Sequence, residues 1–158
     1  VAIPGGVTLK NAKIHESLIE ADVWINVPVL KNHGGAKLTC AMKNYMGIVW
    51  DRRYFHSNDL QQCIADICKK NKKPVLNIVD AYRIMHKNGP QGKSLSDVAQ
   101  LKTLIASTNI VATDTAALRF FNQVEKLDIS AVGHIGKGEA LKLGTSNLDK
   151  LTIKRIKI

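Results

Sequence analysis

The apolar positions of this chain fall into short runs that alternate with helical patterns. Residues 23–30 and 75–80 form nearly continuous apolar runs typical of buried strands, and residues 101–107 resemble a third strand. Pro28 cannot donate to a strand ladder, so pairing of the first strand should stop near it. Strands that alternate with helices predict an α/β fold, here a three-layer arrangement around a mainly parallel sheet.

The helical patterns lie after these runs. The strongest covers residues 58–70, where one apolar stripe recurs at intervals of three and four: Leu60, Cys63, Ile64, Ile67 and Cys68. Residues 109–122 predict a second helix that buries Leu118 and Phe121. A helical turn is predicted at residues 16–21.

Weaker patterns complete the chain. Residues 129–143 predict a short helix interrupted by glycines, and residues 86–93 a loop rich in turn residues. Residues 12–15 and the last eight residues are strand-like. We therefore expect one α/β domain over residues 1–158.

The length of the chain limits its organisation. With 158 residues, of which 45% are hydrophobic, the chain can close one substantial core. It begins at Val1 inside an apparent element, so we expect a fragment of a longer protein. No apolar run reaches the roughly 18–20 residues needed to span a membrane. We expect a cytoplasmic domain, although export of the full-length protein stays open.

The charge favours anionic partners. Lys and Arg number 23 against 13 Asp and Glu, a net charge of +10. Part of the excess lies in the run KKNKK at residues 69–73, which suits a helix end and a solvated face. Aromatic residues make up only 5% of the chain, too few to favour a stacking platform for nucleic acid. A non-catalytic nucleic-acid-binding or protein-binding module remains the alternative hypothesis.

The three cysteines form no cluster motif. Cys40, Cys63 and Cys68 lack the C-x-x-C spacing of zinc or iron–sulfur sites, so reduced thiols are expected. Cys63 and Cys68 lie on the apolar stripe of residues 58–70 and belong to the predicted core. Cys40 lies between His33 and Lys43, where a catalytic or cluster-ligand role stays open.

The segment from Ile25 to His56 carries most of the candidate chemistry. An apolar run delivers Lys31, Asn32 and His33 into a glycine turn, and further polar residues follow closely: Lys43, Asn44, Arg52 and His56. Ligands of open α/β sheets bind beyond the carboxyl ends of the strands, where Asp80 and the segment carrying Asp114 should also lie if the strands are parallel.

This cluster predicts a pocket for an anionic ligand or cofactor. Cations hold phosphate or carboxylate, and an imidazole can move a proton or bind a metal. The catalytic candidates are His33, His56 and Lys43, and the two histidines are also the metal candidates. The ligand-binding candidates are Lys31, Asn44, Arg52, Asp80, Gly89 and Asp114.

Structural explanations compete for several of these residues. Asp80 and Asp114 could simply cap turns or helices. His15, His86 and His134 have no supporting neighbours and are treated as surface or hydrogen-bonded residues. The glycine-bearing loops match neither a P-loop nor a dinucleotide-binding motif.

Five segments in fixed order resemble the domain-of-unknown-function family 362. They are INVPVLKNH, CAMKNYMGI, DRRYFH, IVDAYRIMHKNGPQG and LIASTNIVATDTAAL, and the likeness extends from about Ala21 to Phe121. Members are commonly described as iron–sulfur-associated, with a separate cysteine-rich, ferredoxin-like segment. The resemblance thus implies a redox or iron–sulfur-linked protein, in which a 4Fe-4S cluster or a ferredoxin-like partner would lie outside this chain.

The same resemblance implies site residues. It carries over Lys31, His33, Lys43, Asn44, Gly47, His56, Asp80, Gly89, Pro90 and Asp114. A fainter likeness to the N-terminal domain of nickel-pincer lactate racemases rests on His33, Lys43 and His56, and implies a cofactor-bearing lysine at Lys43. The family has no settled reaction, so the substrate and any cofactor of this chain remain unknown from its sequence.

Overall fold

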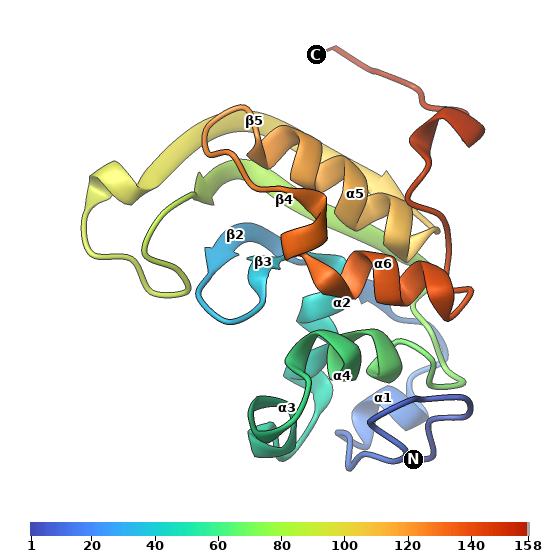
Figure 1. Ribbon diagram of the computed structural model, residues 1–158. Coiled ribbons are helices and arrows are strands. Elements are labelled where there is room, and N and C mark those ends of the chain that lie inside the picture. The colour runs from blue at the N-terminus through green and yellow to red at the C-terminus, as the bar shows by residue number, and fades with distance from the viewer. Residues whose placement is uncertain (158) are drawn as a thin grey trace.

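A computed structural model describes residues 1–157 and contains a five-stranded mixed sheet (Figure 1). Its strands are β1 (Ile25–Asn26), β2 (Val29–His33), β3 (Lys37–Thr39), β4 (Leu76–Met85) and β5 (Val98–Ser107). β1 and β2 lie parallel to β4, whereas β3 is antiparallel to β2 and β5 to β4. Three of the five strands therefore run in one direction.

The helices stack in layers beside the sheet. They are α1 (Ser17–Glu20), α2 (Ala41–Asn44), α3 (Arg53–Ser57), α4 (Leu60–Ile67), α5 (Ile110–Phe121) and α6 (Gly133–Ala140). α5 and α2 pack on the sheet, and α6 and α4 form a further layer beyond them (Figure 1). The predicted single α/β domain with three layers is confirmed, with the sheet as an outer layer.

The first predicted strand is split in two by Pro28. β1 and β2 pair with different parts of β4, and between them the Asp80 N–H donates to the Pro28 carbonyl at 2.9 Å. Its side chains also alternate: Asn26 and Leu30 are buried while Ile25 and Val29 are exposed. The prediction of a fully buried strand was therefore wrong for one face.

The third predicted strand runs opposite to the direction expected. β5 pairs with β4 in antiparallel register, from Asn77 opposite Ser107 to Met85 opposite Val98. The connection between them is a loop with one 3-10 turn, Leu95–Asp97, and no crossover helix. Such a connection joins antiparallel strands, because parallel strands need a longer crossover. β4 also continues past Asp80 to Met85, so Asp80 is not at a strand end.

Most predicted helices are confirmed, with small shifts at their ends. The long apolar stripe forms α4, and the predicted helix at residues 109–122 is α5, which buries Leu118 and Phe121. Residues 12–15 form only an isolated bridge between Ile14 and Val49. Residues 151–157 form no strand, and the remainder of that prediction, residue 158, lies outside the described residues.

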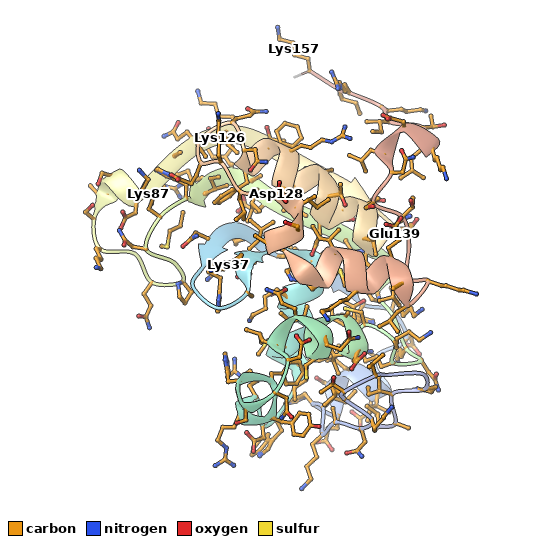
Figure 2. All side chains as sticks on the ribbon, in the orientation of Figure 1. Lys37, Lys87, Lys126, Asp128, Glu139 and Lys157 are labelled. Atoms are coloured by element: carbon orange, nitrogen blue, oxygen red, sulfur yellow. The ribbon has the colours of Figure 1, made fainter. Side chains whose placement is uncertain are left out.

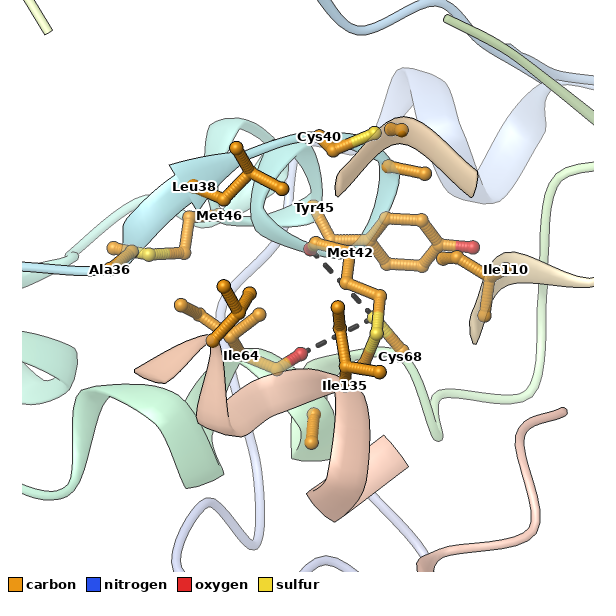
Figure 3. Packing of buried hydrophobic residues seen from close by; sticks show 14 of the residues in the cluster. Ala36, Leu38, Cys40, Met42, Tyr45, Met46, Ile64, Cys68, Ile110 and Ile135 are labelled. Carbon is orange, nitrogen blue, oxygen red and sulfur yellow. Dashed lines mark hydrogen bonds between the residues drawn. The ribbon is translucent and has the colours of Figure 1, made fainter. Parts of the chain in front are cut away.

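The core lies between α2, α4 and α6. Met42, Tyr45 and Met46 come from α2 and the following 3-10 turn Tyr45–Ile48, and pack with Ile64 of α4 and Ile135 of α6 (Figure 3). Cys68 closes this contact, since its Sγ lies 3.3 Å from the Ile64 carbonyl and 3.8 Å from the Met42 carbonyl. This packing fixes α2, which carries two candidate site residues.

Within residues 1–157, none of the helices combines the length and the apolar character that crossing a membrane requires.

Candidate functional site

Three elements supply the cationic residues of the candidate site. Lys31 and His33 lie on β2, Lys43 lies on α2, and His56 lies on α3 with Arg52 immediately before it. Lys31, His33 and Lys43 are half-buried, whereas Arg52 and His56 are exposed. We refer to these five residues as the cationic cluster.

The charges of these groups lower the pKa values of His33 and Lys43. Partial burial lowers the pKa of His33 below its ordinary value of 6.5, and the charges of Lys43, His56 and Lys31 lower it further. Burial also lowers the pKa of Lys43, with added repulsion from Arg52 and Lys31. The five residues that the sequence placed in one site therefore act on one another in the folded chain.

No carboxylate of the described residues forms an ion pair with the cationic cluster. The nearest acid in sequence, Asp51, is used by Arg53, whose guanidinium lies 2.7 Å from Oδ2. That hydrogen bond lowers the pKa of Asp51 to about 2. The cluster thus concentrates positive charge that no ion pair within residues 1–157 compensates.

Two glycine-bearing loops meet beside His33. The Gly89 N–H donates to Oδ1 of Asn32 at 2.9 Å, and the Gly34 N–H donates to the Gly89 carbonyl at 3.3 Å. A Cβ on Gly89 would lie 1.9 Å from the Asn32 carbonyl oxygen, so only glycine fits this approach. The ring of His33 is oriented in the same turn, because its Nδ1 accepts from the Ala36 N–H at 3.1 Å.

The loop that carries Gly89 is organised by Asp97. This carboxylate accepts from the Lys93 N–H at 2.6 Å, the Ser94 N–H at 3.1 Å and the Asn88 amide at 2.8 Å. These bonds lower the pKa of Asp97. Asp97 therefore fixes the shape of the loop from within, while the contact between Gly89 and Asn32 holds the loop on β2.

Asp114 supports the first residues of α2 and does not belong to the cationic cluster. Its fully buried carboxylate accepts from the Ala41 N–H at 2.8 Å and the Met42 N–H at 3.2 Å. Nε2 of buried His134 lies 3.5 Å away, and Nδ1 of that ring lies 2.6 Å from Gln61 Oε1. Asp114 thus links α5 and α6 to the start of the helix that carries Lys43.

Asn44 is held by a chain of amides. Its Nδ2 donates to Asn26 Oδ1 at 2.8 Å, and Asn26 donates to Asn77 Oδ1 at 2.9 Å. Asn77 in turn donates to the Ser107 carbonyl at 3.2 Å. This chain joins the end of α2 to three strands, so Asn44 has a structural role whether or not it contacts a ligand.

Asp80 lies apart from the cationic cluster. It pairs in the sheet with Val29 and Leu104, and its Oδ1 accepts from the Tyr82 N–H at 2.9 Å. Neither Asp80 nor Asp114 is among the charges that shift the pKa of His33 or Lys43. The structure therefore brings together the cations and the glycine loops, but not the two carboxylates.

The cysteines do not fit an iron–sulfur cluster. All three are buried and free, and burial raises the pKa of Cys63 to about 11 and those of Cys40 and Cys68 as well. For Cys40, Asp114 adds to the effect, so its thiol is held in the unreactive protonated form. Among residues 1–157, no three histidine, cysteine or acidic residues gather in a way that could hold a metal ion.

Sequence reasoning missed two residues of this region. Asn32 was named beside the site but not as part of it, although its side chain docks the Gly89 loop. The sequence feature that could have revealed Asn32 is its position between the two candidates Lys31 and His33. His134 was set aside, yet it lies against Asp114; its distance of 20 residues along the chain leaves no sequence pattern that could reveal this contact.

Comparison with known proteins gives one match. No curated protein and no solved structure matches this chain. The family model described as Domain of unknown function (DUF362) matches residues 1–119, which reaches the start of the chain and extends beyond the segments that suggested the family. Because this match covers most of its length, the chain belongs to the DUF362 family.

Proposed function

We propose that this domain binds an anionic small molecule or cofactor at the cationic cluster, as part of a redox or iron–sulfur-linked protein. The observation that carries the proposal is electrostatic: partial burial and neighbouring cations both lower the pKa values of His33 and Lys43, and the described residues supply no carboxylate partner. Keeping like charges together is unfavourable, so a protein retains such an arrangement where a ligand offsets it.

The residue types suggest a division of roles. Lys31, Lys43 and Arg52 would hold the anion, with Arg52 able to form a bidentate contact with phosphate or carboxylate. His33 and His56 would move a proton or bind a metal. With its lowered pKa, His33 is neutral near pH 7 and suits a general base better than an acid.

The glycine loops would form one wall of the site. Gly34 and Gly35 are exposed in the turn that orients His33, and the Gly89 loop is docked beside them. Glycine has no side chain, so it allows a ligand to approach the backbone of this wall closely. Asp114 and the amide chain through Asn26 would fix α2 rather than contact the ligand.

Calorimetric titration with phosphate, pyrophosphate and oxalate tests this proposal. The wild-type chain should bind at least one of these anions, and the double variant Lys43→Gln/His33→Asn should lose that binding while keeping its circular dichroism spectrum. The double variant Lys126→Gln/His15→Asn changes the same residue types elsewhere and should bind as the wild type does. Equal affinities of the two double variants would contradict the proposal.

The alternative is a non-catalytic module that binds nucleic acid or protein through its basic surface. The net charge of +10 and the exposed lysines such as Lys37, Lys87 and Lys126 favour it (Figure 2). Polyanion binding should weaken steeply with salt and depend little on sequence. A ligand of the cationic cluster should survive moderate salt and discriminate among anions of equal charge.

A racemase-like cofactor domain is a further, smaller possibility. Its support is that Lys43 and His56 both act on the pKa of His33, so these three residues lie in one region. Intact mass measurement followed by peptide mapping of the protein purified from its natural host tests it directly. A covalent adduct that maps to Lys43 would favour this function, and an unmodified lysine would remove it.

A further inference from the structure

A small cavity lies beside the first turn of α5, and none of the residues that line it belongs to the cationic cluster. It also borders the 3-10 turn Tyr45–Ile48, the end of α4 and the start of β4. Its volume is about 60 Å³. One water-sized group needs roughly 10–15 Å³ of such space, so the cavity has room for a ligand of about four or five heavy atoms.

The hydroxyl of Tyr45 faces this cavity. The residue is only 2% exposed, and the ring of Trp24 packs against its ring with the two centroids 5.2 Å apart. Figure 3 shows the hydroxyl directed toward Ile110, which lines the same cavity. No group within residues 1–157 forms a hydrogen bond with it. Because a buried tyrosine hydroxyl normally has a hydrogen-bond partner, we expect a ligand to supply one.

The first two amides of α5 also lack acceptors. Asn109 caps the helix: its Oδ1 accepts from the Ala112 N–H at 3.0 Å and its carbonyl from the Thr113 N–H at 2.9 Å. The N–H groups of Ile110 and Val111 remain, and neither has an acceptor in the part of the chain that the structure describes. Both residues are buried. Amides at the positive end of a helix attract an anion.

The charged groups around the cavity favour an anion as well. Lys73 lines it, is exposed, and forms no ion pair with any residue from 1 to 157. No aspartate or glutamate of the described chain lines it. Burial, with Cys68 and Asp114 nearby, raises the pKa of Tyr45, so its hydroxyl stays protonated and can donate. The cavity therefore offers donors and one positive charge.

We propose that this cavity binds a small monocarboxylate, of the size of acetate or propionate. The carboxylate accepts from the Tyr45 hydroxyl and the Ile110 N–H, and Lys73 supplies the opposite charge. Pro74 and Leu143 also line the cavity and suit a short alkyl group. Phosphate would set further oxygens against these apolar side chains, where they find no donors. The proposal does not depend on the anion site at the cationic cluster.

Amide NMR of the labelled chain during titration with acetate and propionate tests this inference. The Ile110 and Val111 resonances should shift and saturate, whereas phosphate and the larger benzoate should leave them in place at equal ionic strength. Tyr45→Phe should weaken carboxylate binding roughly tenfold or more, because it removes a donor to a charged group. Tyr82→Phe makes the same change on a tyrosine that is 51% exposed and should bind as the wild type does.

Three results of this titration would overturn the proposal. In the first, neither carboxylate shifts the two amides of α5. In the second, phosphate or benzoate shifts them as strongly as propionate does. In the third, Tyr45→Phe binds propionate with the affinity of the wild type.

Thermal unfolding separates a ligand-binding hydroxyl from a structural one. Without carboxylate, Tyr45→Phe should melt no lower than the wild type, because its hydroxyl has no partner in the described chain. Propionate should raise the melting temperature of the wild type above its value in chloride, but not that of Tyr45→Phe. A lower melting temperature for carboxylate-free Tyr45→Phe would overturn the proposal. Lys43→Gln/His33→Asn should keep the propionate effect, so failure at the cationic cluster and failure at this cavity are distinguishable.

Discussion

At the scale of single residues, the environment of Lys43 disfavours the charged form of its side chain. The side chain is half-buried, and both burial and the charges of Arg52 and Lys31 lower its pKa. The charge therefore weakens the fold unless an anion lies beside it. A site built to bind an anion exchanges stability for binding, so under the proposed function a neutral side chain should give a more stable chain that no longer binds the anion.

Lys43→Met should accordingly raise the free energy of unfolding by about 0.5–1 kcal/mol near pH 7 while removing anion binding. The folded pKa lies below the unfolded value of 10.5, so the unfavourable term is present at lower pH and disappears as pH rises through 10.5. Urea unfolding at neutral and alkaline pH measures both effects. A variant less stable than the wild type at pH 7 would contradict this account.

Asp114 shows how a candidate ligand residue can prove to be a support. Its buried carboxylate accepts two amide hydrogen bonds at the start of α2 and faces His134. Asp114→Ala should cost about 3–5 kcal/mol, because it leaves buried donors and an imidazole without their partner. Asp128→Ala, which removes an exposed cap on Ser130, should cost about 1 kcal/mol. Equal losses in urea unfolding would argue against this role.

At the scale of elements, the sequence predicted what depends on local periodicity. The apolar stripe of α4 and the capped helix α5 were found within a few residues of their ends. The direction of β5 was not predicted correctly, because side chains alternate in the same way in parallel and antiparallel strands. Its direction depends on the connection at residues 86–97, whose path is set by Asp97 and by docking on Asn32.

The cationic cluster was predictable for a related reason. Lys31, His33, Lys43, Arg52 and His56 all come from one short segment, so few long-range contacts are needed to bring them together. Asp80 and Asp114 were assigned to the same rim by assuming that strands end together. β4 instead continues beyond Asp80, and β5 runs the other way, so that assumption did not hold for them.

The docked loop yields a prediction at this scale. Gly89→Ala should separate the loop from β2, because its Cβ would overlap the Asn32 carbonyl, and it should weaken anion binding at least several-fold. Gly136→Ala is the matched control: nothing lies within 4 Å of its added Cβ, and alanine should stabilise α6 by up to about 1 kcal/mol. Calorimetry and urea unfolding of both variants check this. Unchanged binding in Gly89→Ala would remove the loop from the site.

At the scale of the whole molecule, the net charge of +10 gives every anion some stabilising effect. Specific binding adds to this general screening, because a ligand that binds only the folded state raises its stability by mass action. Phosphate should therefore raise the melting temperature more than chloride at equal ionic strength. In Lys43→Gln/His33→Asn this excess should vanish. An excess of the same size in both proteins would indicate diffuse screening alone.

The most direct test of the anion site follows the ring of His33 by NMR. In the free protein the pKa of His33 lies below 6.5, because burial and the charges of Lys43, His56 and Lys31 disfavour the protonated ring. A bound anion reverses that field, so titration of the Cε1–H resonance with saturating phosphate, pyrophosphate or oxalate should move this pKa upward. The assignment is checked with His33→Asn. A pKa that stays the same with all three anions would contradict the central claim.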